Sequence, residues 1–126
     1  MFPLNLQKPA GTPPAGDGFV DVLALEALAV GGQHVAQLGL RRVLLCRTSD
    51  SELHAVSDIC PHALQPLAGG EVANGTIRCP KHGARFELCS GKALNAVTKA
   101  PLPVHAVRIR DGRIEVASLP NPQATP

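Results

Sequence analysis

The chain has 126 residues, a formal net charge of +2 and no Trp or Tyr. This length predicts one domain with a small core. The weak charge and the scarcity of stacking aromatic side chains argue against a nucleic-acid-binding protein. The N-terminus lacks a basic segment followed by an apolar run, and no run approaches the roughly 20 apolar residues of a membrane span. We therefore expect a cytoplasmic protein that does not enter a membrane.

Both ends of the chain are rich in proline, and glycine is frequent near the start. Such composition is typical of segments outside a packed core. The sequence therefore predicts a flexible arm over residues 1–17, a single domain over 18–117, and a flexible tail over 118–126.

Within the domain, short apolar runs are separated by turn residues. These runs predict strands over residues 19–22, 34–38, 42–47, 53–56, 76–79, 84–88, 104–109 and 113–116. Residues 21–28 also have apolar side chains at helical spacing, so a short helical turn is the alternative there. Gly39 and the pair Asp111–Gly112 mark hairpin turns. Many short strands with frequent turns are typical of an antiparallel all-β sandwich or barrel.

Two short Cys/His elements interrupt this series of strands. The first is Cys60-Pro61-His62 and the second is Cys79-Pro80-Lys81-His82, and sixteen residues lie between them. In a reducing compartment, cysteines indicate metal ligands in preference to disulfides. Two thiolates and two imidazoles form a ligand set for iron or zinc. We expect residues 58–91 to form a small metal-binding lobe inserted into the β domain.

Two other chemistries fit part of this pattern. A tetrahedral site with two sulfur and two nitrogen ligands suits Zn²⁺ as well as iron. Nucleophilic catalysis needs one cysteine and one base, and would leave the second pair unexplained. The one-residue spacing of Cys60 and His62, together with Gly83 after the second pair, favours a [2Fe–2S] cluster with mixed ligands.

The motif Cys60-x-His62, sixteen residues, then Cys79-x-x-His82-Gly83 resembles the Rieske [2Fe–2S] family. The segment from His82 to Leu94 is similar to Rieske-type ferredoxins of bacterial ring-hydroxylating oxygenase systems. The resemblance extends from about Phe19 to Ala117. It implies a Rieske-like antiparallel β sandwich or barrel with a small inserted cluster-binding lobe.

The resemblance also implies the cofactor and its ligands. One Rieske [2Fe–2S] cluster is expected, with Cys60 and Cys79 on the inner iron and His62 and His82 on the outer iron. The chain would act as a carrier and not as an enzyme, passing one electron from a flavin-dependent ferredoxin reductase to a terminal oxygenase, both bound transiently. The alternative is a Rieske-like small subunit of a larger reductase, such as assimilatory nitrite reductase. A catalytic oxygenase is rejected because it needs a further mononuclear iron site.

Four positions bear on the reduction potential. High-potential members of the family carry an extra cysteine in each motif, joined as a disulfide, and the matching positions here are Gln65 and Lys81. They also place serine and tyrosine hydroxyls beside the cluster, where this chain has Ala84 and Phe86. Fewer hydrogen-bond donors stabilise the reduced cluster less. We therefore expect a low-potential centre.

The remaining candidate ligands have no metal spacing. Cys46 lies in an apolar run and is interpreted as a small buried hydrophobic residue, and Cys89 as a partly exposed thiol. His34, His54 and His105 are interpreted as structural or surface residues. Basic residues near the lobe are interpreted either as a docking patch or as a solvated face: Lys81, Arg85 and Lys92.

Overall fold

A computed structural model describes residues 18–61, 64–81, 83–95 and 97–121. It confirms the all-β fold, with three antiparallel sheets and no α-helix among these residues. The elements are β1 (Phe19–Ala24), the 3₁₀ turn η1 (Leu25–Ala27), β2 (Gln33–Leu38), β3 (Arg41–Arg47), β4 (Leu53–Ser57), β5 (Glu71–Ala73), β6 (Thr76–Arg78), β7 (Arg85–Glu87), β8 (Val104–His105), β9 (Val107–Arg110) and β10 (Arg113–Ala117).

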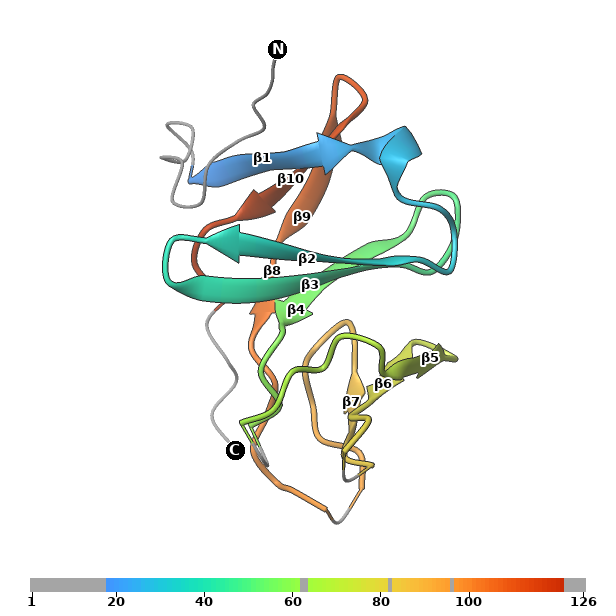
Figure 1. The fold of residues 1–126 in the computed structure, drawn as a ribbon, viewed down its shortest axis with the longest axis vertical. Helices are drawn as coiled ribbons and strands as arrows, with labels where there is room; N and C mark the ends of the chain where they lie inside the picture. The colour runs from blue at the N-terminus through green and yellow to red at the C-terminus, as the bar shows by residue number, and fades with distance from the viewer. Residues whose placement is uncertain (1–17, 62–63, 82, 96, 122–126) are drawn as a thin grey trace.

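The sheets divide the domain into a base and a lobe. The base contains a three-stranded sheet in the order β1-β10-β9 and a four-stranded sheet in the order β2-β3-β4-β8. The lobe contains the short sheet β5-β6-β7 and lies at the end of the base opposite β1 (Figure 1). The chain leaves the base after β4 and returns to it at β8, so the lobe is an insertion between these two strands.

Strand β3 is buried on both of its faces and joins the two parts. Side chains alternate between the faces of a strand. Val43 and Leu45 pack into the core between the two base sheets, whereas Leu44 and Cys46 pack into a second core with the lobe. The unbroken apolar run of this strand therefore reflects two cores, one on each side.

Two-residue turns close two of the hairpins. Asp111 and Gly112 have φ angles of 52° and 73°, and Asn74 and Gly75 have the same two values. Positive φ at both central positions is the geometry that Asn-Gly and Asp-Gly favour in tight hairpins. The first turn joins β9 and β10 as predicted. The second joins β5 and β6 and belongs to a hairpin whose first strand was not predicted.

The prediction of one strand over 104–109 is wrong. The chain bends at Ala106, so that β8 pairs with β4 in one base sheet and β9 pairs with β10 in the other. The carbonyl of Ala106 accepts a hydrogen bond from the backbone N–H of Ala117 at 2.8 Å. The bend thus lets one segment bond to both sheets.

Near the start of the domain, the predicted strand and the alternative helical turn are both present in part, because β1 ends at Ala24 and η1 follows it.

The predicted arm over 1–17 and most of the predicted tail lie outside the described residues. The domain bounds 18–117 and the lobe bounds 58–91 therefore stay predictions. Across the part of the chain that the structure describes, no helix is long and apolar enough to cross a lipid bilayer.

Gly91 anchors the end of the lobe and should not tolerate a side chain. Its φ is +79°, and a Cβ atom would overlap the carbonyl oxygen of Leu102. Replacing Gly91 by Ala should lower the free energy of unfolding by more than the roughly 1–2 kcal/mol that a left-handed alanine costs alone. Gly75→Ala is the control, because Gly75 has φ +73° with open space around its Cα. Urea unfolding followed by circular dichroism measures both, and equal losses would contradict the clash.

His105 should make the fold sensitive to mild acid. It is 3% exposed, and its Nδ1 lies 2.8 Å from the carbonyl oxygen of Ala117. Burial lowers the pKa of His105 below 6.5, against an opposing effect of that hydrogen bond, and Arg41 lowers it further. The unfolded chain then binds the proton more readily than the folded one. This contribution to stability is complete above about pH 6.5 and declines as the pH falls below it.

The measurement is the free energy of unfolding from urea titrations across this pH range. Burial also lowers the pKa of His54, which adds a dependence of the same sign. His105→Gln should be less stable at neutral pH and should lose less stability on acidification than the unchanged chain. An identical pH dependence in the two proteins would show that His105 does not contribute.

Candidate metal centre

Two loops with the same backbone hydrogen bonds form the site. In the first, the N–H of Cys60 donates to the carbonyl of Gln65 and the carbonyl of Cys60 accepts from the N–H of Leu64, both at 2.8 Å. In the second, the N–H of Cys79 donates to the carbonyl of Ala84 at 2.7 Å, and its carbonyl accepts from the N–H of Gly83 at 3.0 Å. Each cysteine thus begins a closed loop of the same size.

The fourth residue after each cysteine has a left-handed backbone. Gly83 has a φ of +77°, which glycine adopts without strain. Leu64 occupies the matching place in the first loop with a φ of 55°, although its side chain gains no burial and is 75% exposed. A leucine in this conformation is held there by the loop hydrogen bonds. The repeated geometry supports a common role for the two loops.

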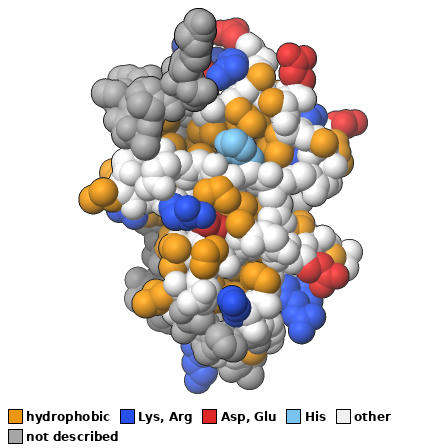
Figure 2. Space-filling model, in the orientation of Figure 1, with side chains coloured by type: hydrophobic (Ala, Val, Ile, Leu, Met, Phe, Trp, Pro, Cys, Tyr) orange, Lys and Arg blue, Asp and Glu red, His pale blue; other side chains and the backbone are white. Residues whose placement is uncertain are grey.

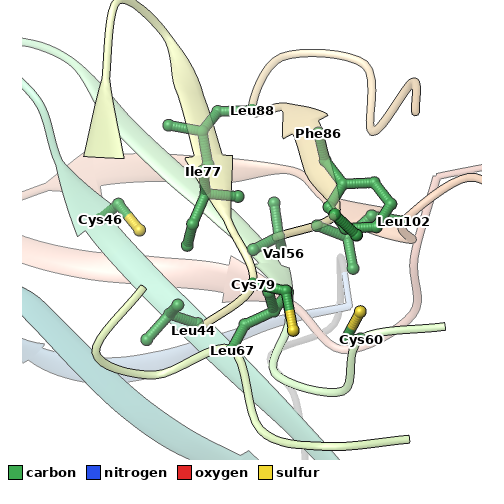
Figure 3. Close-up of a cluster of buried hydrophobic side chains, with 11 residues drawn as sticks. Leu44, Cys46, Val56, Cys60, Leu67, Ile77, Cys79, Phe86, Leu88 and Leu102 are labelled. Carbon is green, nitrogen blue, oxygen red and sulfur yellow. The ribbon is translucent and has the colours of Figure 1, made fainter. Parts of the chain in front are cut away.

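Both thiols that begin the loops are inside the protein. Cys60 is 0% exposed and Cys79 is 1% exposed, and both belong to the core that the lobe shares with β3 and β4. Figure 3 shows them at one edge of this core, apart from Cys46. All four cysteines of the chain are thiols and not disulfides. Two buried thiols on matching loops are suited to hold an iron–sulfur cluster as thiolates.

A buried carboxylate fixes the first loop to the base. Asp58 is 0% exposed, and its Oδ2 accepts hydrogen bonds from Nε and Nη2 of Arg42 at 3.0 and 2.8 Å. Its Oδ1 accepts from the N–H of Ala68 at 2.9 Å. The carbonyl of Asp58 also accepts from the N–H of Leu67. One residue therefore holds both ends of the first loop against β3.

Asn95 fixes the second loop in a similar way. Its Nδ2 donates to the carbonyl of Gly83 at 2.9 Å, and its Oδ1 lies 3.4 Å from the N–H groups of Arg85 and Val97. The segment that contains Asn95 and Val97 is also bonded to β7, because the N–H of Leu94 donates to the carbonyl of Arg85 at 2.8 Å. This segment thus packs beside the loop that begins at Cys79.

The two predicted imidazole ligands, His62 and His82, lie outside the described residues. Among those that are described, no three His, Cys, Asp or Glu side chains are grouped as metal ligands. The structure therefore places the two cysteines of the predicted set, and the assignment of the histidines stays a prediction. The donors that are placed, two buried thiols, fit the inner iron of a mixed-ligand [2Fe–2S] cluster.

The other described cysteines and histidines are not part of the two loops. Cys46 is 1% exposed, and burial together with the nearby Asp58 carboxylate raises its thiol pKa to about 12. It therefore stays protonated and packs as a small apolar side chain. Cys89 is exposed, His34 and His54 are half-buried on β2 and β4, and His105 is buried on β8.

The positions that bear on the potential divide into two kinds. Ala84 and Phe86 are both 0% exposed and lie in the core that contains the cluster thiols. Neither side chain can donate a hydrogen bond. Gln65 and Lys81 are exposed and are not cysteines. The surroundings described here thus supply apolar packing where high-potential members would supply hydroxyl donors.

Basic side chains are spread over the lobe. Figure 2 shows several at the lobe end of one face. Lys81 and Lys92 are exposed, whereas Arg85 is half-buried and its Nη1 donates to Oγ1 of Thr76 at 2.8 Å. Arg85 is thus engaged within the lobe, while the two lysines are available to solvent or to a partner.

Three residues beside the site were not identified from the sequence: Asp58, Asn95 and Arg78, whose guanidinium lies next to the Cα of Gly83. Asp58 lies two residues before Cys60, but its partner Arg42 is sixteen residues away and no local pattern links them. Asn95 and Arg78 act through contacts with the second loop, which a linear motif does not reveal. The only available signal was their position next to the two Cys/His elements.

Comparison with known proteins identifies the family. The family model of the Rieske [2Fe-2S] domain matches residues 18–117. The ferredoxin subunit of anthranilate 1,2-dioxygenase from Burkholderia cepacia is 33% identical over 78 residues, which are 62% of this chain and 71% of that protein.

Two solved structures have the same fold. One is described as a complex of reduced oxygenase and oxidized ferredoxin in carbazole 1,9a-dioxygenase; the matched chain has a TM-score of 0.78 and 25% identity, over 84% of this chain and 98% of that one. The other, a putative NADH-dependent nitrite reductase small subunit from Mycobacterium tuberculosis, has a TM-score of 0.71 and 25% identity, over 78% and 92%. With its two matching loops and its buried thiols, the chain belongs to the Rieske [2Fe–2S] family, and its cofactor is a Rieske [2Fe–2S] cluster.

Proposed function

We propose that this chain carries single electrons to a terminal oxygenase, from a flavin-dependent ferredoxin reductase. It is a Rieske ferredoxin, the electron-carrying component of a multicomponent dioxygenase system, and not itself the oxygenase. When bound, the cluster supplies a site that accepts and releases one electron. The protein's part is to hold the cluster, tune its potential and present it to each partner in turn. We further propose that this takes place in the cytoplasm.

The observation that carries this proposal is the pair of matching loops that begin at buried thiols. Cys60 and Cys79 would hold the inner iron from inside the core, and His62 and His82 would hold the outer iron. The two cysteines are held by backbone bonds within their loops, and Asp58 and Asn95 hold the loops to their surroundings. A rigid cluster environment suits electron transfer because little has to reorganise when the charge changes.

The partner surface should combine apolar and basic side chains. Exposed apolar side chains on the lobe include Leu64, at 75%, and Leu94, at 43%. Lys81 and Lys92 add positive charge to the same lobe. The solved complex that contains the matched chain pairs a ferredoxin with an oxygenase. An interface of the same kind is proposed here. A carrier must leave after each transfer, so the interface should be small.

The test is the electron paramagnetic resonance spectrum of the dithionite-reduced protein, followed by voltammetry. A rhombic Rieske-type signal and one electron per chain are expected. A colourless protein that contains zinc would overturn the proposal. Because Ala84 and Phe86 cannot donate hydrogen bonds, the potential should fall near the bottom of the Rieske window of about −150 to +300 mV. A midpoint above about +100 mV, on the scale of the same window, would contradict the prediction of a low potential but not the proposed function.

A second candidate function is that of a small subunit held permanently in a larger reductase. The likeness to the nitrite reductase small subunit favours it. The two functions differ in the lifetime of the complex. Size-exclusion chromatography with the purified partner enzyme separates them, because a transient carrier elutes alone and a subunit elutes as a stoichiometric complex. The four-ligand motif in this sequence favours the carrier.

A further inference from the structure

The side chain of Arg78 packs against the second cluster loop. A Cβ atom added to Gly83 would lie 3.2 Å from both Nε and Nη2 of Arg78 and 3.7 Å from its Cζ. The guanidinium therefore lies over the Cα of Gly83. Only glycine leaves this space open while it also adopts the positive φ that closes the loop. The arginine thus brings its positive charge directly onto the loop that begins at Cys79.

Arg78 and Cys79 line the same pocket. A solvent-open pocket of about 470 Å³ is lined by Gly69, Glu71, Arg78, Cys79, Pro80, Lys81 and Gly83. Two of these residues are basic and one is acidic, so the pocket is positive overall. Arg78 immediately precedes Cys79, and its side chain turns back over the residues that follow.

Glu71 is not in ion-pair contact with Arg78 in the described part of the chain. The two residues are cross-strand partners in the β5–β6 register, yet the side-chain ion pairs identified in the described part of the chain are those of Arg42, Arg108 and Arg113. Glu71 lines the same pocket as Arg78. Arg78 and Glu71 are therefore charged residues of opposite sign beside the same pocket.

We propose that Arg78 raises the reduction potential of the cluster through its charge on the second loop. This inference rests on the proposed function, since it requires the cluster at Cys60 and Cys79. Reduction adds one negative charge to the cluster, and a nearby cation stabilises the reduced form more than the oxidised form. Arg78 and Lys81 are exposed, so water and salt reduce the effect without removing it. Arg78 thus partly offsets the lowering of the potential expected from Ala84 and Phe86, whose side chains cannot donate hydrogen bonds.

The experiment compares the midpoint potentials of purified, cluster-containing variants by voltammetry. Arg78→Gln should shift the potential to more negative values, and Arg78→Lys should restore most of it because the charge returns. Glu71→Gln should shift it to more positive values. Arg110→Gln is the matched control, because it removes an equal charge from an exposed residue of β9 in the base, and it should leave the potential unchanged.

The shift of Arg78→Gln should also shrink between about 0.01 M and about 1 M salt, because exposed charges are screened. If Arg78 had only a structural role, Arg78→Gln would alter cluster content or stability. The potential would then not shift in opposite directions in Arg78→Gln and Glu71→Gln. The inference is overturned if Arg78→Gln and Arg110→Gln have the same potential, or if Glu71→Gln and Arg78→Gln shift it in the same direction. If the Arg78→Gln protein does not assemble its cluster, an unchanged potential in Glu71→Gln overturns the inference. The spectrum of the unaltered protein, recorded first, tests the proposed function separately.

Discussion

Replacing Arg42 by methionine should lower the free energy of unfolding by about 3 kcal/mol, the lower end of the range for breaking a buried ion pair. The reason is the unequal burial of the pair. The side chain of Asp58 is 0% exposed, whereas that of Arg42 is 45% exposed. Methionine keeps the apolar stem of the arginine, but among the described residues it leaves the buried carboxylate with the N–H of Ala68 as its donor. The main cost is therefore an uncompensated buried charge.

Two variants separate this cost from simple loss of a surface interaction. Arg113→Met removes an arginine that is 41% exposed and is paired with Asp21, itself 28% exposed. That pair is solvated, and its loss should cost about 1 kcal/mol or less. The double variant Arg42→Met with Asp58→Asn should be more stable than Arg42→Met alone, because the amide carries no charge. If Arg42→Met costs no more than Arg113→Met, Asp58 does not depend on Arg42.

The measurement must suit a chain without Trp or Tyr. Urea unfolding followed by far-ultraviolet circular dichroism gives the free energies, and iron per chain gives cluster content. Because Asp58 also bonds to Ala68 and Leu67, we expect Arg42→Met to lose cluster more readily than Arg113→Met does. Stability of the fold and retention of the cluster would then decline together.

Local patterns in the sequence predicted the parts of the fold that depend on neighbouring residues. The hairpin between β2 and β3, the turn at Asp111–Gly112, and β4, β6, β7 and β10 all follow from alternation and turn chemistry over a few residues. The short strand β5 was missed although Asn74–Gly75 is a strong hairpin signal. Three residues are too few for the alternation to stand out.

Features that depend on distant partners could not be predicted in this way. The run 104–109 reads as one strand, and only the two separate sheets that it joins explain the bend at Ala106. The burial of Asp58 depends on Arg42 from another strand, and the position of Arg78 depends on the space above Gly83. The candidate site shows the same division. The Cys/His elements are local and could be predicted, and the structure places their two cysteines inside the protein. The contacts of Asp58, Asn95 and Arg78 with the two loops could not be predicted.

Replacing His62 by cysteine should lower the reduction potential of the cluster by on the order of 100 mV or more, provided the cluster assembles. Rieske centres lie at about −150 to +300 mV, and plant-type clusters with four cysteines lie near about −400 mV. The exchange of a neutral imidazole for a thiolate adds one negative charge at the iron, so a further electron is harder to add. Replacing one of the two imidazoles by a thiolate should therefore give a potential between these two values.

The control is His34→Cys, which adds a thiol on the half-buried strand β2 of the base and should leave the potential unchanged. Voltammetry gives the potentials, and the average g value of the reduced protein should rise towards that of all-cysteine clusters in His62→Cys alone. Equal potentials in the two variants would argue that His62 is not a ligand. Under these two proposals, His62→Cys changes the charge of the cluster itself, whereas Arg78→Gln changes the electrostatic field around it. The shift in His62→Cys should therefore depend less on salt than the shift in Arg78→Gln.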